Sequence, residues 1–243
     1  MSLNLPTPAS ALAIAAHPDD VEFGCGGTLA KWAASGCVVH HLVCTDGSKG
    51  SWDPYDDTVA LIAQRQDEQR AAAKALGATG DVVFLGHVDG ELASALAERE
   101  EVARVIRELQ PEVVLGHDPW RRYRLHPDHR NAGLLAVEGI VAARDPHFFP
   151  EQGITHWRPS TLLLWEADEV DHVEDVTSFV DAKLAALLEH RTQLRSTMHI
   201  EVGTTDEGAQ RDNFRRRVLD RLATFGRTEG IAYGEGFKRI ADL

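Results

Sequence analysis

The sequence is short of cysteine and of long apolar runs, and these shortages weigh against several classes of protein. Its 243 residues include only three cysteines, Cys25, Cys37 and Cys44, which cannot all pair and show no CxxC spacing. This argues against a disulfide framework, and the expected location is the reducing cytoplasm. Its apolar runs, such as 113–115 and 162–165, are far too short for a transmembrane segment. The N-terminus lacks the basic start and apolar core of a signal peptide.

Positive charge is also scarce. Lys and Arg number 25 against 38 Asp and Glu, so the formal net charge is −13. This balance argues against non-specific binding to nucleic acid or to an anionic membrane, but it leaves a small-molecule substrate open. The hydrophobic share of 43% and the charged share of 26% are ordinary for a globular protein. With no repeat or linker-like tract, we expect residues 1–243 to form one domain.

Apolar strand-like runs alternate with helical stretches along the first 143 residues. Such alternation with short connections predicts right-handed βαβ units, a mostly parallel sheet and a Rossmann-like, three-layer α/β fold. We expect strands at 11–17, 38–45, 81–86 and 112–116, and helices at 26–35, 60–76, 92–109 and 127–143. Beyond these, we expect a loop at 145–159, strands at 160–166 and 172–176, and helices at 178–196 and 210–225.

The first expected strand ends abruptly in a polar cluster, His17-Pro-Asp-Asp20. In α/β sheets the carboxyl ends of the strands are where ligands bind. His17 and Asp20 are suitable ligands for zinc, and Asp19 between them is a candidate general base.

A second polar cluster, His126-Pro-Asp-His129, follows the fourth expected strand. Pro127 fits the first turn of a helix, which places His126 near the N-cap and His129 one turn further along. A catalytic zinc needs three nitrogen or oxygen ligands and one open position, and His17, Asp20 and His129 make such a set. One such motif alone could be a surface turn, but two motifs after two strands favour a zinc site at the carboxyl ends of the strands.

These motifs resemble those of the zinc-dependent LmbE-like de-N-acetylases, also called the GlcNAc-phosphatidylinositol de-N-acetylase family. The resemblance is carried by residues 16–22 and 24–29 and by His126-Pro-Asp-His129. Weaker similarity extends to Arg65-Gln-Asp-Glu68, to residues 183–193 and to residues 233–237, so the likeness spans about residues 11–240.

The resemblance implies hydrolysis of an N-acetyl group on an aminosugar or aminosugar conjugate, which yields a free amine and acetate. It also implies a role for each matching residue. His17, Asp20 and His129 would bind Zn²⁺, and Asp19 would be the general base. His126 would stabilise the oxyanion or protonate the leaving amine, with Asp128 orienting and tuning it. Arg65 would contact sugar hydroxyls. Assembly into a homo-oligomer is a further expectation from the family.

Several residues have alternative interpretations. Gly24-Cys-Gly-Gly27 resembles a dinucleotide-binding loop, but GxGxxG spacing requires glycine at Leu29, so tight backbone packing explains the glycines better. Arg65 could instead pair with Glu68 on its own helix. His117, with Asp118, also ends a strand and could line the cleft or replace a ligand. Asp89 follows the third strand at the same edge and is a candidate substrate ligand.

Other functions and contacts also stay open. The chain could be a zinc amidase that cleaves a larger amide of a thiol–sugar conjugate or secondary metabolite. It could also be an inactive metal- or sugar-binding protein, although the free carboxylate of Asp19 argues against this. Relatives that act on aminosugar thiol precursors carry tyrosine where this chain has Arg124, with Tyr123 beside it. We expect residues 121–124 to form a solvated loop or to contact an acidic part of the substrate. Specificity is expected to lie in loops 47–57, 117–125 and 145–158.

Overall fold

The computed structural model describes all 243 residues, and one eight-stranded sheet runs through it. The strand order is β1-β7-β8-β6-β5-β2-β3-β4, and every pair is parallel except the two that involve β8. The predicted mostly parallel sheet is confirmed. The strands are β1 Ser2–Leu3, β2 Ser10–Ala15, β3 Val38–Thr45, β4 Val82–His87, β5 Val113–His117, β6 Thr161–Trp165, β7 His172–Asp175 and β8 Gly234–Ala241.

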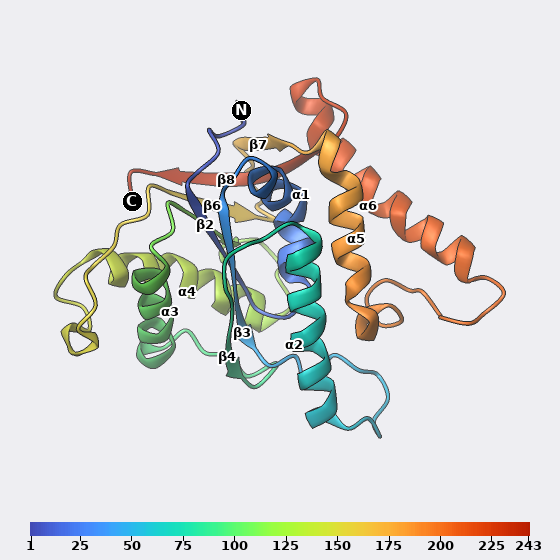
Figure 1. Cartoon of the computed structure of the whole chain (residues 1–243), viewed down its shortest axis with the longest axis horizontal. Helices are drawn as coiled ribbons and strands as arrows, with labels where there is room; N and C mark the ends of the chain where they lie inside the picture. Colours follow the sequence, from blue (N-terminus) through green and yellow to red (C-terminus); the bar gives the residue numbers. More distant parts are fainter.

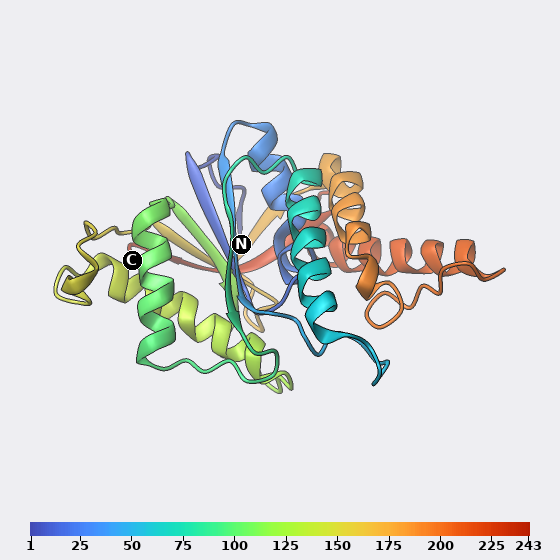
Figure 2. The ribbon, with the colours of Figure 1, turned by 60° about the horizontal axis from the view of Figure 1, so that its bottom comes forward.

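Helices cover both faces of the sheet and complete the predicted three layers (Figure 1, Figure 2). One face carries α1 Asp20–Ala34, α2 Thr58–Ala75 and α5 Val180–Glu189, and the other carries α3 Leu96–Leu109 and α4 Pro127–Arg144. The last helix, α6 Glu207–Glu229, packs against β7, β8 and α5. Single 3₁₀ turns occur at 150–152, 177–179 and 191–193. None of these helices combines the length and the apolarity that crossing a bilayer requires.

Strand β2 is buried on both sides because its side chains alternate between two cores. Leu12 and Ile14 pack with α3 and α4, whereas Ala13 and Ala15 face the core that α1, α2 and α5 cover. A strand with helices on both faces is apolar throughout rather than alternating. The central position of β2 places its polar carboxyl end, His17 to Asp20, in the middle of one edge of the sheet.

Strand β8, which lies antiparallel between β6 and β7, was not predicted from the sequence. Its glycines and charged side chains lower its local strand propensity, and only tertiary packing explains them. A Cβ atom on Gly234 would lie 2.6 Å from Val173, and one on Gly236 would lie 2.5 Å from Phe225. The strand therefore depends on close approach by neighbours that local sequence does not reveal.

Helix α1 begins at Asp20, six residues before the predicted start, and non-helical dihedrals at Cys25 interrupt it. The glycines follow from crowding at this kink. A Cβ atom on Gly24 would lie 2.6 Å from the Trp165 indole, and one on Gly27 would lie 2.9 Å from Val176. Backbone packing, rather than dinucleotide binding, therefore accounts for the cluster.

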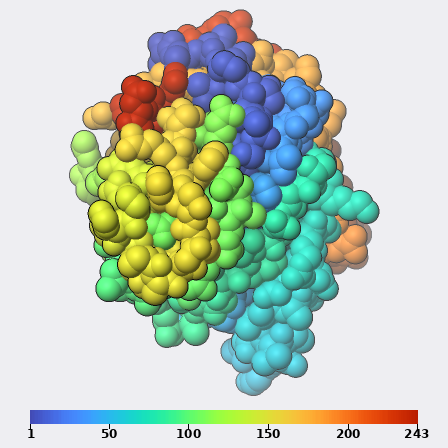
Figure 3. Space-filling view, turned by 60° about the vertical axis from the view of Figure 1, so that its left-hand side comes forward, coloured from blue at the N-terminus to red at the C-terminus, as the bar shows by residue number.

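The end of another predicted helix also shifts. Helix α5 ends at Glu189 instead of 196, because His190 leaves the helical conformation and its ring nitrogen Nε2 lies 3.0 Å from Glu22. The expected loop after α4 is held by one buried arginine, whose guanidinium donates to the carbonyl groups of Ala143 at 3.1 Å and Phe148 at 2.8 Å. This arginine is Arg107 on α3. Figure 3 shows the segment around residue 150, in yellow, spread over the side of the molecule that this view brings forward.

Glu235 of β8 joins the interrupted helix α1 to helix α5. Its carboxylate accepts hydrogen bonds from the backbone N–H groups of Gly27 at 2.9 Å and Thr28 at 2.7 Å. These donors follow the kink at Cys25, where the helix leaves N–H groups without an intrahelical partner. The Lys183 ammonium lies 2.6 Å from the same carboxylate, and both side chains are buried.

We predict that Glu235→Ala lowers the free energy of unfolding by about 3–5 kcal/mol, because the ammonium of Lys183 stays buried without its partner. Urea titration followed by circular dichroism measures the loss. Lys238→Ala is the matched control in the same strand, since its ion pair with Asp171 is far more exposed and its removal should barely move the unfolding midpoint. Equal midpoints for the two variants would contradict the role of Glu235.

Candidate metal centre and active site

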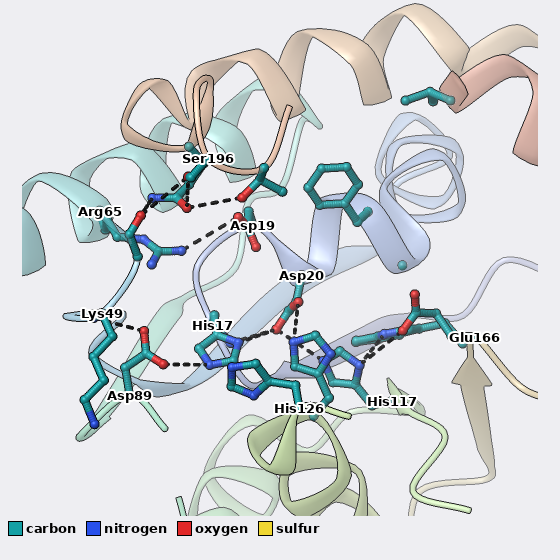
Figure 4. A pocket seen from close by; sticks show the side chains of 18 of the residues that line it. His17, Asp19, Asp20, Lys49, Arg65, Asp89, His117, His126, Glu166 and Ser196 are labelled. Atoms are coloured by element: carbon teal, nitrogen blue, oxygen red, sulfur yellow. Dashed lines mark hydrogen bonds and ion pairs between the residues drawn. The ribbon is translucent and has the colours of Figure 1, made fainter. Parts of the chain in front are cut away.

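The carboxyl ends of five parallel strands meet at one cavity of about 630 Å³. All five ends supply lining residues, namely His17 after β2, Lys49 after β3, Asp89 after β4, His117 in β5 and Glu166 after β6. Figure 4 shows these side chains converging, with those of Asp19, Asp20 and His126 among them. The strand-end location predicted from the sequence therefore coincides with the main cavity.

The Asp20 carboxylate is the hub of a histidine cluster. Its Oδ2 atom lies 3.3 Å from Nδ1 of His17, and its Oδ1 atom lies 3.3 Å from Nε2 of His129. Zinc bonds of about 2.0–2.1 Å in a tetrahedral arrangement hold ligand atoms about 3.4 Å apart. Asp20 therefore lies at this spacing from His17 and from His129, through different carboxylate oxygens. Ligand atoms that all lie within 4.8 Å of one another are offered by His17, His126 and His129, and by Asp20, His117 and His129. His126 and His117 also offer ring nitrogens to this cluster.

His17 is supported from behind by two further carboxylates. Its Nε2 atom lies 3.2 Å from Asp128 and 3.2 Å from Asp89, while its Nδ1 atom faces Asp20. Burial lowers the pKa of His17, but the three carboxylates outweigh burial and raise it well above its usual value. The surroundings thus favour a cation at this point. A carboxylate behind a histidine is also the arrangement that orients metal ligands in proteins.

Asp128 contacts residues other than the one predicted. It is fully buried, accepts the backbone N–H of Gly90 at 2.6 Å, and makes its histidine hydrogen bond to His17. It makes no hydrogen bond to His126 and influences it only through charge. His126 does form the N-cap position of α4, as its following proline predicted. Burial lowers the pKa of the His126 imidazole, and the nearby His17 adds to this effect.

Asp19 lies beside the cluster in a left-handed backbone conformation, with φ of 103°. Non-glycine residues in this region are uncommon and are concentrated at functional sites. Its backbone N–H donates to Oε1 of Gln69 at 3.0 Å, which holds the turn in place. Burial raises the pKa of its carboxyl to about 6. A carboxylate with this pKa accepts a proton more readily than an exposed aspartate does.

A buried polar network below Asp19 was not predicted. Gln69 donates to Glu22 at 2.8 Å, and Glu22 also lies 3.0 Å from His190. The ring of His41 completes the network, 3.1 Å from Gln69. Glu22 and His190 stand within the family-like motifs, but no sequence pattern indicated that residues so distant along the chain would meet.

Arg65 of α2 is buried and binds the backbone of two site loops. Its guanidinium donates to the carbonyl groups of Pro18 at 2.7 Å and Gly47 at 2.9 Å, and it lies 3.7 Å from Asp19. The alternative pairing with Glu68 does not occur, because Glu68 accepts hydrogen bonds from Thr192. Arg65 therefore lines the cavity and fixes its two nearest loops.

His117 faces Asp20 from the side opposite His17, and its orientation is determined by Trp165. The Trp165 indole N–H donates to Nδ1 of His117 at 3.0 Å, and an indole can only donate. In neutral His117 the proton therefore resides on Nε2, which lies 3.3 Å from Asp20 Oδ2. Together with Asp20 and His129, His117 also forms one of the groups whose ligand atoms all lie within 4.8 Å of one another. Asp118 is turned to its own loop, where it accepts from Trp120.

The loop before His126 is anchored through Glu166. Arg124 lies 2.7 Å from this carboxylate and 3.1 Å from Nδ1 of His129, so the expectation of a solvated loop is wrong at this residue. Tyr123, by contrast, is 88% exposed. Burial raises the pKa of Glu166, but Arg221 and Arg124 outweigh it and hold the pKa at about 2.

The cavity walls differ from the loops that were expected to set specificity. Lys49, Gly50 and Trp52 of the first loop line the cavity, and His117 begins the second, but no residue of 145–158 contributes. That segment packs over α3 and α4 instead. The missing wall comes from α6 and from residues 193–197. Sequence order gave no indication that the last helix reaches the site.

The fold and this cluster define an α/β protein with a candidate metal centre of histidine and aspartate at the carboxyl ends of its strands. Residues 12–140 match the family described as PIG-L, GlcNAc-PI de-N-acetylase. The chain belongs to this family, and the resemblance noted in its sequence is confirmed.

Relatives with named activities are similar to much of the chain. Diacetylchitobiose deacetylase of Thermococcus kodakarensis is 34% identical over 185 residues, which cover 75% of this chain and 69% of that protein. The 1D-myo-inositol 2-acetamido-2-deoxy-alpha-D-glucopyranoside deacetylase of Streptomyces avermitilis is 35% identical over 170 residues, covering 60% of this chain and 57% of that protein.

Solved structures share the fold. The N,N'-diacetylchitobiose deacetylase of Pyrococcus horikoshii, complexed with its inhibitor MPG, aligns with a TM-score of 0.85 at 28% identity, covering 96% of this chain and 84% of that chain. GalB, the 4-carboxy-2-hydroxymuconate hydratase of Pseudomonas putida, aligns at 0.75 and 25% identity, covering 96% and 97%. Because a hydratase shares the fold, the reaction has to be argued from the site.

We predict that neutral His117 carries its proton on Nε2 in the metal-free protein. Long-range ¹H–¹⁵N correlation spectra distinguish the two ring nitrogens and check this directly. Trp165→Phe removes the shorter of the two hydrogen bonds to Nδ1 and leaves only that from Arg124 at 3.5 Å, so the spectrum of that variant should show a larger share of the other tautomer. Protonated Nδ1 in the unaltered protein would be incompatible with the Trp165–His117–Asp20 arrangement.

Proposed function

We propose that this protein is a zinc-dependent hydrolase that removes the N-acetyl group from an aminosugar or an aminosugar-containing conjugate. The observation that carries the proposal is the Asp20-centred cluster with the buried carboxyl of Asp19 beside it. Two relatives whose names specify deacetylation of N-acetylglucosamine-type sugars support the choice of reaction.

We propose His17, Asp20 and His129 as the zinc ligands, since two imidazoles and one carboxylate form a known type of catalytic zinc site. Bound zinc would lower the pKa of a coordinated water towards 7 and polarise the substrate carbonyl. Asp128 and Asp89 would hold His17 by its outer nitrogen, and His117 would orient Asp20 from the opposite side.

Asp19 would act as the general base, because its carboxyl lines the cavity and its burial raises its proton affinity. Arg65, 3.7 Å away, would limit that rise. His126 stands at the mouth of the cavity at the N-terminus of α4 and would protonate the leaving amine or stabilise the oxyanion. The carboxylate of Asp128 would favour its charged form from nearby.

Substrate hydroxyls would meet the polar end of the cavity. Asp89 accepts the backbone N–H of Lys49 at 3.1 Å, and its other oxygen contacts His17. The carboxylate retains lone pairs for a sugar hydroxyl. Arg65 would contribute by shaping the loops at Pro18 and Gly47 and by presenting its guanidinium to the cavity.

The proposal also includes three expectations about the whole chain: its location, its domain organisation and its assembly. The three cysteines are buried and free, which suits a reducing cytoplasm. Strands from both ends of the chain share one sheet, which supports a single domain over residues 1–243. A homo-oligomer would cover exposed apolar side chains beside the site, such as Trp120 and Leu125.

The competing functions make different products. An inactive binding protein would retain zinc but release no amine, and a hydratase would add water to a carbon–carbon double bond. Only a deacetylase or amidase releases a primary amine. A screen for amine release across N-acetylated sugars, sugar–inositols and glycosylated natural products therefore tests the proposal, and activity on none of them would overturn it.

The two adjacent aspartates should respond differently to substitution. We predict that Asp19→Asn retains about one zinc per chain while kcat falls by about 10²–10⁴-fold, since only the base is lost. Asp20→Asn should purify with little zinc. Elemental analysis and amine release measure both effects. Loss of zinc in the Asp19 variant, with zinc retained in the Asp20 variant, would mean that the two roles are exchanged.

The pH dependence of kcat/KM should reflect the protonation of Asp19, the proposed general base. Asp19 accepts a proton only as its carboxylate, so kcat/KM should rise with pH and level off above about 6, where its pKa lies. A bound dication would move this limb to lower pH, because it favours the carboxylate. Rate profiles between pH 4 and 9 measure it, and an acidic limb centred above pH 7 would contradict the assignment.

A further inference from the structure

The turn that carries Asp19 is held by two side chains of helix α2. Arg65 and Gln69 lie one turn apart on this helix, so both project from the same side of it. Arg65 donates to the carbonyl of Pro18 at 2.7 Å, and Gln69 accepts the backbone N–H of Asp19 at 3.0 Å. Figure 4 shows the guanidinium of Arg65 beside Asp19.

These two hydrogen bonds act on a single peptide unit. The carbonyl of Pro18 and the N–H of Asp19 belong to the same rigid plane and point in opposite directions. Arg65 therefore holds one edge of the plane, and Gln69 holds the other. All four residues are buried, so the loss of either partner leaves a backbone polar group poorly satisfied.

The backbone at Asp19 is strained in the orientation that this pair maintains. Its φ of 103° and ψ of −27° lie where residues other than glycine are rarely found. A half-turn of the Pro18–Asp19 peptide would bring φ to about −77°, which with the same ψ is an ordinary helical conformation. That relaxed orientation would give up both hydrogen bonds to α2. Arg65 and Gln69 therefore keep the turn in its strained form.

The carboxamide of Gln69 is itself oriented by the buried network. Its Nε2 atom donates to Glu22 at 2.8 Å and lies 3.1 Å from Nδ1 of His41. A carboxylate only accepts hydrogen bonds, so the amide nitrogen faces Glu22 and the amide oxygen faces Asp19. Glu22 is held in turn by His190, 3.0 Å away. The acceptor for the Asp19 N–H is thus fixed before any substrate binds.

The direction of the Asp19 carboxyl depends on this peptide. The side chain leaves the Cα atom at a fixed angle to the Cα–N bond, and that bond changes direction when the peptide turns. Asp19 lines the cavity, whereas Gln69 does not. A general base has to lie within hydrogen-bonding reach of the proton that it takes, and small misplacements cost much of the rate. Gln69 would therefore act on the reaction through Asp19, without touching the substrate.

We propose that Arg65 and Gln69 clamp the Pro18–Asp19 peptide and that Gln69 is a positioning residue for the general base. This inference rests on the proposed hydrolase function. Gln69 holds the turn in its strained conformation, in which Asp19 presents its carboxyl to the cavity beside the proposed metal ligand Asp20. Without Gln69 the turn relaxes, and the base is in place for only a fraction of the time.

Gln69→Met tests the proposal, because methionine has a similar volume but offers no strong acceptor. On the best substrate of the amine-release screen, kcat should fall about 5–100-fold, the loss that corresponds to about 1–3 kcal/mol of released strain. KM should change by less than about threefold, with zinc retained, since Gln69 does not touch the substrate. Unchanged kcat in this variant would overturn the proposal.

Gln66→Met is the matched control. It makes the same substitution on the same helix at a half-buried position that does not line the cavity, so its kcat should equal that of the unaltered enzyme. A loss as large as that of Gln69→Met would mean that the helix, rather than the hydrogen bond to Asp19, is what matters, and it would overturn the proposal.

A double-mutant cycle separates positioning of the base from a general structural role. If Gln69 acts through Asp19, adding Gln69→Met to Asp19→Asn should lower kcat by less than about twofold beyond Asp19→Asn alone. Effects that multiply would place the action of Gln69 elsewhere and overturn the proposal.

A crystal structure of Gln69→Met tests the clamp without any reaction. The Pro18–Asp19 peptide should be turned, with a negative φ at Asp19. A peptide that keeps its orientation would overturn the clamp, and a turned peptide with unchanged kcat would overturn the positioning role. If the unaltered enzyme releases no amine from any compound of the screen, the proposed function fails, and the structure of the variant still decides the clamp.

Gln69→Glu serves if the methionine variant does not fold. It keeps an oxygen for the Asp19 N–H, and a proton shared with Glu22 replaces the amide hydrogen. Its kcat should stay within about threefold of that of the unaltered enzyme, because the clamp is preserved. A loss of more than about tenfold, with zinc bound and the turn unchanged, would overturn the proposal.

Discussion

The contacts around the Asp20 carboxylate are the constraint on which the rest of the site depends. One side chain lies 3.3 Å from three different imidazoles, which reach it from β2, β5 and α4. Burial alone would raise the pKa of Asp20, but His129 and His117 outweigh it and hold the pKa well below its usual value. The carboxylate is therefore charged, and it draws the ends of separate strands into one centre.

Much of the surrounding structure serves to position this carboxylate. Its own helix begins at Asp20 and is interrupted at Cys25, where Glu235 and Lys183 secure the next turn. Trp165 packs against Gly24 and also sets the ring of His117. Trp165 is thus a core residue that also contacts the candidate metal centre, through its hydrogen bond to His117. The stability of the fold and the geometry of the site are linked here because Trp165 contributes to both.

The sequence predicts the fold well where local patterns carry it. The strand–helix alternation, the strand-end position of His17 and the helix start at Pro127 all follow from short-range rules, and the structure agrees. Strand β8 could not be predicted, because its glycines make sense only against Phe225 and Val173. The kink in α1 likewise arises from contacts made across the sheet.

In the site, too, local motifs predict some features, whereas others depend on tertiary contacts. The motifs place His17, Asp20 and His129 together, but they do not indicate that Asp128 turns to His17 or that Arg124 reaches His129. Those contacts depend on how loops fold back over the sheet edge. The reach of α6 into the cavity is also invisible in the sequence, since its apolar residues read as ordinary core positions.

Anomalous diffraction tests the identity of the metal ligands most directly. Crystals grown with zinc and measured on both sides of the zinc absorption edge should show one strong peak within about 2.0–2.2 Å of His17, Asp20 and His129. The peak should lie outside bonding distance of Asp19 and His117. A peak bonded to His117 in place of His17, or no peak at the cluster, would contradict the account.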